Sequence, residues 1–186
     1  MTDILRTARF EFAAHGYEGT TMRIIAQNAG VDAALIHHFF LTKEGLFLNV
    51  VKGAFSPPQL AAHGLRGPRE QAGTELAHAY ITHWEDPEVR PRVLAVMRSL
   101  TALDSAAAII RNCVDEVLFP AVRSLDVDRP RIRAGLVGSH LIGMALARYV
   151  LEAEPLSSLS PDEVIAYLGD ACAPFLFEPL GPVDVG

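Results

Sequence analysis

Several features are scarce in this sequence, and each absence excludes a class of protein. Its 186 residues contain two cysteines, Cys113 and Cys172, which are too few for a disulfide framework and lack the spacing of a zinc site. The longest apolar stretch, residues 135–151, contains His140 and Arg148 and is therefore no candidate for a membrane span. The first residues also lack the pattern of a secretory signal. We expect a cytoplasmic protein without membrane contact, bound metal or cofactor.

Strand signals are scarce as well. There is no clean alternation of apolar and polar residues, and Asn-Gly and Asp-Gly hairpin turns are absent. Helical periodicity instead recurs between glycine and proline breaks. We therefore predict an all-α protein of about nine helices, at residues 4–15, 22–29, 33–40, 43–55, 69–85, 87–103, 105–125, 130–154 and 161–177.

The acidic balance of the chain is not uniform. A net charge of −6 argues against nucleic acid as a partner, since DNA-binding domains are usually basic. In residues 1–52, however, five basic side chains balance five acidic ones, so the whole net charge lies beyond them. This asymmetry indicates two parts with different partners. We predict one domain at residues 1–47, a helical domain at 48–178 and a disordered tail at 179–186.

Residues 21–40 have the dimensions of a helix-turn-helix, with two eight-residue helices around Gly30. Gly30 would supply a left-handed turn, and the first helix would pack through Ile25 and Ala26 on Leu35 and Ile36 of the second. The second helix would then present its first residues to a major groove. Thr21 and Lys43 stand at expected helix N-termini, where backbone N–H groups favour a phosphate.

At this point the sequence resembles the DNA-binding domain of the TetR family of transcriptional repressors, over residues 10–48. The resemblance rests on Phe12-Ala13, Gly16-Tyr17, Thr20-Thr21, Ile24-Ile25-Ala26, Ala29-Gly30-Val31, Phe40 and Lys43-Glu44-Gly45-Leu46-Phe47. It implies a regulator, most readily a repressor, that binds a palindromic operator as a homodimer and is released by a small-molecule effector. It also implies backbone contacts from Thr21, Arg23, His37 and Lys43, and places Asp32, Ala33, Ala34 and His38 at or beside base edges.

The chain departs from the family pattern at three points. Asp32 stands where serine or threonine is common, His37 stands where tyrosine is usual, and a basic arm before the first helix is missing. Asp32 would either cap the second helix or accept a hydrogen bond from a cytosine amino group. Fewer phosphate contacts predict weaker binding with a shallower salt dependence. A packed helical hairpin without a DNA partner is the alternative, whereas His37 and His38 point about 100° apart and make a poor metal pair.

The helix expected at residues 130–154 is apolar on nearly all sides, which is typical of a helix buried on two sides. Its second side would face another subunit or, in a monomer, the interior. With the helix at 161–177 it would form a four-helix bundle across a two-fold axis. The expected dimer-face residues are Leu136, Ser139, Gly143, Val164, Leu168, Cys172 and Phe175.

A ligand pocket would be enclosed by the middle helices if the resemblance holds. Candidate lining residues are Tyr80, Trp84, Met97, Leu100, Phe119, His140 and Met144, although such residues at helical spacing are more often plain core. His140 is the most distinctive, because a polar group in so apolar a helix must find a partner. Catalytic motifs are absent, so we expect no enzyme. The alternative function, favoured by Asp32 and the missing arm, is a helical small-molecule-binding protein or enzyme that does not bind DNA.

Overall fold

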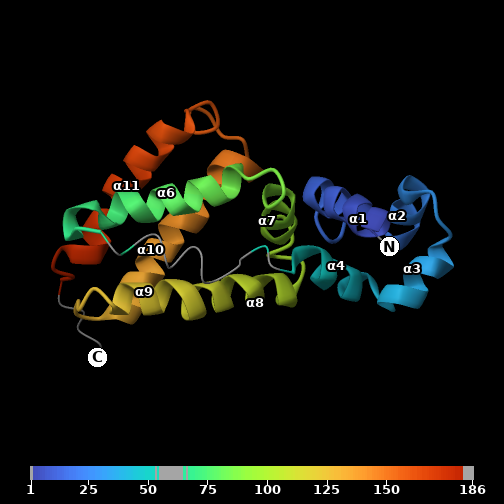
Figure 1. Ribbon diagram of the computed structural model, residues 1–186, viewed down its shortest axis with the longest axis horizontal. Helices are drawn as coiled ribbons and strands as arrows, with labels where there is room; N and C mark the ends of the chain where they lie inside the picture. The colour runs from blue at the N-terminus through green and yellow to red at the C-terminus, as the bar shows by residue number, and fades with distance from the viewer. Residues whose placement is uncertain (1, 53, 55–64, 66, 182–186) are drawn as a thin grey trace. The chain divides into compact units, whose positions relative to one another are not determined.

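A computed structural model describes residues 2–52, 54, 65 and 67–181 of the protein. Within these ranges the regular structure is helical throughout (Figure 1), which confirms the all-α class, and each of the nine expected helices has a counterpart. The Pro-rich segment expected at 56–68 and the expected tail lie partly outside the described residues. In chain order the α-helices are α1 (Thr2–His15), α2 (Met22–Ala29), α3 (Ala33–Phe40), α4 (Lys43–Val51), α6 (Ala72–Glu85), α7 (Arg90–Met97), α8 (Asp104–Cys113), α9 (Phe119–Arg123), α10 (Pro130–Ala145) and α11 (Pro161–Phe177).

Some helix boundaries differ from the expectation. The helix predicted at 105–125 is α8, a π-helical turn η2 (Val114–Leu118) and α9. The π-helical turn ends two residues before Pro120, which has no N–H for an α-helical bond. The helix predicted at 130–154 is α10 followed by a second π-helical turn η3 (Leu146–Val150). The helix predicted at 87–103 is the shorter α7, which ends at Met97. It begins only at Arg90, because the Asp86 carboxylate accepts from the backbone N–H of Glu88 and holds the chain in a turn. A single turn of 3-10 helix, η1 (Arg69–Gln71), leads into α6.

The chain separates into two compact units that differ from the predicted sequence ranges. The first unit is Met1–Ser56 with Trp84–Arg111, and the second is Pro57–His83 with Asn112–Gly186. A stretch of the middle region, including α7, therefore packs with the N-terminal helices rather than with the C-terminal ones. Local periodicity did not indicate this, because it reports which face of a helix is buried and not against which partner. That residues 1–47 form a functional domain of their own stays a prediction, because the compact unit around them has other bounds.

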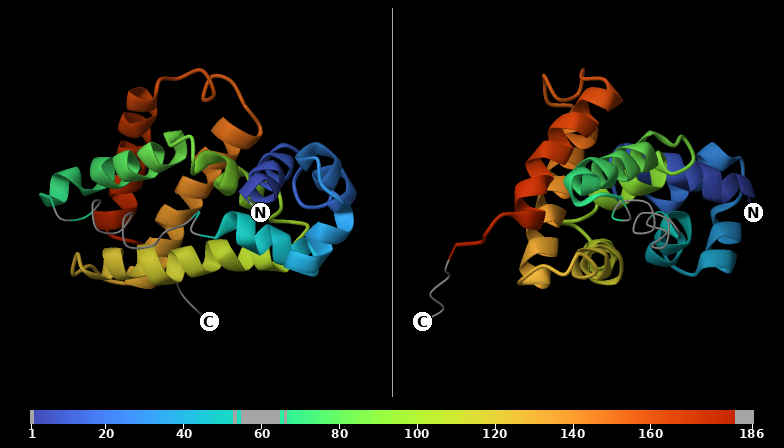
Figure 2. Two further views of the ribbon diagram at one scale, coloured as in Figure 1. Left: turned by 45° about the vertical axis from the view of Figure 1, so that its right-hand side comes forward. Right: turned by 60° about the vertical axis from the view of Figure 1, so that its left-hand side comes forward.

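In the first unit, α1 is the central helix and packs against α2, α4 and α7 (Figure 2). Phe12 is fully buried, and its ring meets Phe47 edge to face at 5.2 Å. Arg98, which follows α7, donates from Nη1 to the backbone oxygens of residues 13 and 14 at 2.6 and 2.8 Å. Gly16 has a φ of +66°, and a Cβ there would lie 2.8 Å from the Arg98 carbonyl oxygen. Both the backbone conformation and the close approach of α7 therefore require glycine.

In the second unit, α10 packs against α9 and α11. Arg133 of α10 is 2% exposed and serves as a polar clamp inside this unit. Its guanidinium donates to the carbonyl oxygens of Asp128, Phe175 and Glu178 at 2.8, 2.8 and 3.0 Å, and to the Asp128 carboxylate. The hydrogen bond and charge of Arg133 hold the pKa of Asp128 below its ordinary value. No helix within the described ranges has the length and apolar character of a membrane span.

Candidate nucleic-acid interface

Three capping residues shape the segment from residue 21 to residue 32. The Thr21 hydroxyl accepts from the backbone N–H of Ile24 at 3.2 Å and caps α2. Gly30 ends α2 in the left-handed conformation, with a φ of 66°. The Asp32 carboxylate accepts from the backbone N–H of Ala34 at 2.8 Å, which makes Asp32 the N-cap of α3. The capping role that the sequence allowed for Asp32 is therefore formed.

The two helices pack through one face each. Ile25, Ala26 and Ile36 are buried, and Phe40 joins them with 9% of its surface exposed. The expectation that Leu35 packs on α2 is wrong, because Leu35 is 41% exposed. Successive side chains of an α-helix point about 100° apart, so Leu35 and Ile36 lie on different faces of α3. Ile36 and Phe40, four residues apart, share the face that is buried. The opposite face of α3 is thus left free.

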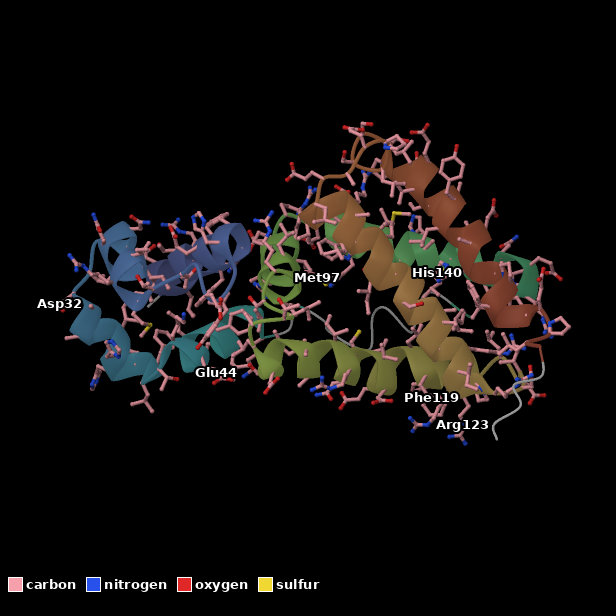
Figure 3. The ribbon with its side chains drawn as sticks, turned by 180° about the vertical axis from the view of Figure 1, so that it is seen from behind. Asp32, Glu44, Met97, Phe119, Arg123 and His140 are labelled. Atoms are coloured by element: carbon pink, nitrogen blue, oxygen red, sulfur yellow. The ribbon has the colours of Figure 1, made fainter. Side chains whose placement is uncertain are left out.

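Most of the candidate DNA-contacting residues lie on the exposed side of this motif. Thr21, Arg23, Asp32, Ala34, His37 and His38 are exposed, and Ala33 and Lys43 are half-buried. Figure 3 shows Asp32 at the outer corner of the turn that leads into α3, pointing away from the neighbouring helices. His37 makes one weak contact, from Nδ1 to the Leu41 carbonyl oxygen at 3.4 Å, so its ring remains available. The motif thus presents the start of α3 together with the capped start of α2.

Lys43 is engaged inside the protein. Its Nζ donates to the carbonyl oxygens of Tyr17 and Thr20 at 2.9 and 3.1 Å and lies 4.1 Å from the centre of the Tyr17 ring. Two of its three N–H donors are therefore used to hold the α1–α2 turn against the start of α4. Burial, with a contribution from the Glu44 carboxylate, raises the pKa of Tyr17. The sequence indicated that Lys43 stands at a helix N-terminus, but it did not indicate these hydrogen bonds to Tyr17 and Thr20.

Leu41 was not singled out by the sequence, yet it has an unusual backbone. Its φ and ψ are 61° and −53°, and the backbone N–H of Thr42 donates to the Phe40 carbonyl across it. This is a γ-turn of the rare, strained kind, and Leu41 is 79% exposed at its centre. A glycine here would have signalled the turn in the sequence, whereas leucine conceals it. The turn connects α3 directly to the cap of α4.

The predicted pocket residues do not converge on one cavity of the described chain. Trp84, Met97 and Leu100 belong to the first unit, where Trp84 and Met97 are buried core. The other four belong to the second unit. Tyr80 donates to the Leu141 carbonyl at 2.8 Å, and Phe119 lines a surface hollow with Arg123. A ligand pocket therefore stays a prediction.

His140 does not occupy the buried site that the sequence suggested. It is exposed on α10, its Nδ1 lies 3.1 Å from the Leu136 carbonyl oxygen, and its ring centre lies 4.6 Å from that of Phe175. With Met144 it lines a hollow of about 330 Å³ between α10 and α11. Figure 3 labels His140 on α10. Three of the predicted dimer residues, Ser139, Gly143 and Leu168, line the same hollow.

Three predicted dimer residues are corrected by their burial. Val164, Leu168 and Cys172 are at most 2% exposed and belong to the core of the second unit, so we assign them to that core and not to a dimer face. Burial also raises the pKa of the Cys172 thiol to about 11. The stripe on α11 was correctly identified as apolar, but it packs inside the chain. Leu136 and Phe175 are half-buried, while Ser139 and Gly143 are exposed.

These contacts define an α-helical protein with an N-terminal helix-turn-helix. The described residues contain no group of three or more histidine, cysteine or acidic side chains that could hold a metal ion. Residues 4–50 match the family model described as bacterial regulatory proteins of the tetR family, and residues 70–174 match that of the tetracyclin repressor-like C-terminal domain. The chain belongs to the TetR family of transcriptional regulators, which are generally non-enzymatic DNA-binding proteins.

Individual relatives agree with this assignment. A TetR-family regulator from Streptomyces coelicolor is similar over 94% of this chain and 93% of its own, at 30% identity and a TM-score of 0.63. A TetR-like transcriptional regulator from Rhodococcus shares the fold, with a TM-score of 0.71 at 15% identity over 94% of each chain. The transcriptional repressor AcnR of Corynebacterium diphtheriae is 44% identical over 50 residues. That match spans 27% of this chain and 26% of AcnR.

Proposed function

We propose that this protein is a homodimeric repressor that binds a palindromic operator and is released by a small molecule bound in its C-terminal domain. The observation that carries the proposal is the capped, exposed start of α3, packed on α2 by its opposite face. This arrangement supports insertion of α3 into a major groove, as in other helix-turn-helix proteins. The proposal includes the absence of enzymatic activity.

The exposed side chains suggest how DNA would be held. The start of α2, capped by Thr21, offers backbone N–H groups to a phosphate, and Arg23 offers a nearby charge. Ala33 and Ala34 are small enough to meet thymine methyl groups, while His37 and His38 project from the next turn of α3. The second oxygen of the Asp32 carboxylate would accept from a cytosine amino group. Lys43 would contribute chiefly by holding the motif together, with one N–H left for a phosphate.

A second copy of the chain would pack on the open face of α10. Ile132 of α10 is 49% exposed and Leu146, the first residue of η3, is 38% exposed, and between them Gly135, Ser139 and Gly143 are exposed at helical spacing. An added Cβ at Gly135 or Gly143 would meet no described atom within 4 Å, so a partner helix has room to approach closely. Small residues between two apolar anchors suit an isologous contact across a two-fold axis. The dimer would place two α3 helices one helical turn of DNA apart.

Release by a ligand requires that it bind the two states of the dimer with different affinity. The hollow beside His140 and Met144 is the described site nearest to the predicted pocket residues. A ligand there would change the packing of α10 on α11, and with it the proposed dimer contact. The effector itself stays unidentified.

Binding to the DNA upstream of the gene for this protein tests the proposal. Fluorescence anisotropy with a labelled duplex should show saturable, salt-sensitive binding that an unrelated duplex of equal length does not reproduce. His37→Ala should weaken it about tenfold, as expected for loss of one good polar contact. His15→Ala, which removes an exposed histidine on α1, is the matched control and should leave the affinity unchanged.

The alternative, a small-molecule-binding protein that does not bind DNA, is favoured by the exposed carboxylate of Asp32 at the start of α3. Asp32→Ser separates the two. Tighter non-specific binding with retained operator recognition supports the repressor. No measurable affinity for any duplex, in the wild type or in this variant, supports the alternative.

A further inference from the structure

A hollow of about 320 Å³ lies on the surface of the first unit, apart from the residues considered so far. Three helices form it: α1 contributes Leu5 and Arg9, α4 and its C-cap contribute Asn49, Val50 and Lys52, and α7 contributes Arg92. Leu5 and Val50 provide an apolar floor. The hollow is lined by three cationic side chains and by no acidic one, which is unusual in a chain whose net charge is −6.

Two of these three cations have no counter-ion within the described part of the chain. Arg9 is paired, since its Nη1 lies 2.9 Å from the Glu88 carboxylate. The side chains of Lys52 and Arg92 form no hydrogen bond or ion pair with any described residue. The Nε of Arg92 is also buried from solvent without a hydrogen-bond acceptor. A buried N–H group without an acceptor costs free energy, so an oxygen ligand that accepted from this guanidinium would be stabilised.

The hollow is separate from the proposed DNA-reading surface. None of its residues lies on α2 or α3, which carry Thr21, Arg23 and the exposed histidines. A concave site lined by cations from three helices suits a small anion better than an extended DNA backbone. Two unpaired positive charges favour an anion that carries two negative charges.

We propose that this hollow binds a small dianionic oxyanion, a phosphate or a short dicarboxylate, between Lys52 and Arg92. Arginine engages carboxylate and phosphate oxygens through parallel N–H donors, and lysine adds a point charge. The apolar floor at Leu5 and Val50 leaves space for the hydrocarbon part of a dicarboxylate. Because the ligand would join α7 to α4 and α1, its binding would stabilise the unit that carries the helix-turn-helix.

Isothermal titration of the full-length protein with inorganic phosphate and, separately, with succinate tests the site without DNA. Chloride at matched ionic strength controls for general salt effects. We expect saturable binding of at least one of the two anions, with one site per chain. Arg92→Gln and Lys52→Gln should each weaken it tenfold or more, the effect of losing one charge-assisted hydrogen bond. Arg90→Gln, on the same helix but outside the hollow, should leave it unchanged.

A thermal melt gives a second measurement. The bound anion should raise the melting temperature by about 5–10 °C when it is a hundredfold above its dissociation constant, and Lys52→Gln should abolish this shift. Lys52 is exposed, so its substitution tests the site even if Arg92→Gln fails to fold. The proposal is overturned if neither anion gives saturable heat or if both variants bind like the wild type. It is also overturned if Arg92→Gln weakens only duplex binding, because the hollow would then serve DNA phosphates.

Discussion

Replacing Leu41 with glycine should stabilise the unit that contains the helix-turn-helix. Leu41 occupies a strained backbone conformation, with φ and ψ of 61° and −53°, at the centre of the turn between α3 and α4. Such a conformation costs a residue with a Cβ about 1–3 kcal/mol, and glycine adopts it freely. Most substitutions of a leucine by glycine destabilise, so the expected sign is the opposite of the usual one.

The magnitude follows from three contributions. Relief of strain provides about 1–3 kcal/mol, and the greater freedom of glycine in the unfolded chain opposes it by about 0.5–1 kcal/mol. Loss of buried apolar surface is small, because the Leu41 side chain is already 79% exposed. The net expectation is a free energy of unfolding higher by about 1 kcal/mol.

The single tryptophan, near the end of α6, gives a fluorescence signal for this unit. Trp84 is 1% exposed and belongs to the first unit, so its fluorescence during a urea titration follows the unfolding of that unit. The midpoint should rise by about 0.5 M with an unchanged slope. Leu41→Ala keeps the Cβ and should give no such gain, and Leu48→Gly, in the regular helix α4, should lower stability by about 1 kcal/mol. A lower midpoint for Leu41→Gly, or an equal gain for Leu41→Ala, would refute the strain argument.

Three further predictions concern polar contacts that hold each unit together. Lys43→Met removes two charge-assisted hydrogen bonds and should lower the stability of the first unit by about 2 kcal/mol in the same urea titration. Arg133→Leu removes the buried guanidinium that donates to the carbonyl oxygens of Phe175 and Glu178 and should destabilise the second unit by about 2 kcal/mol, measured by calorimetry. Because the pKa of Asp128 is lowered in the folded protein, its carboxylate stabilises the fold at pH values above the ordinary carboxyl pKa of about 3.9. This stabilisation is lost as the pH falls through the lowered pKa. Asp128→Asn should therefore flatten the dependence of the melting temperature on pH below about pH 4.

The sequence predicted the helices well because their signals are local. Capping residues such as Ser160, whose capping box with Glu163 is fully formed, mark helix starts through contacts within four residues. The failures involve partners distant in the chain. Periodicity showed that residues 161–177 have an apolar stripe, but not that Val164 and Cys172 face the core of their own chain rather than a second one. The same limit applies to α7, whose partner α1 is more than 70 residues away.

The candidate site was predictable to the same degree. Gly30 and Asp32 act over two to four residues, and their roles in the turn follow from the sequence. Lys43 was placed at the correct helix end, yet its side chain turns inward to Tyr17 and Thr20, 26 and 23 residues earlier. The strain at Leu41 has no sequence signal, since leucine occurs there in place of the glycine that would reveal it.

The first unit is built from two separate stretches of the chain, and this affects how domains could be exchanged between such proteins. Exchanging residues 1–47 with those of a relative would leave α7 facing an unfamiliar α1. The replacement would need glycine at position 16, under the Arg98 carbonyl, and a backbone N–H at residue 17 placed to reach the Ser99 hydroxyl. An exchange that also carries residues 84–111 keeps these contacts intact. The transferable module of DNA recognition is therefore discontinuous in the gene, and a single crossover cannot move it whole.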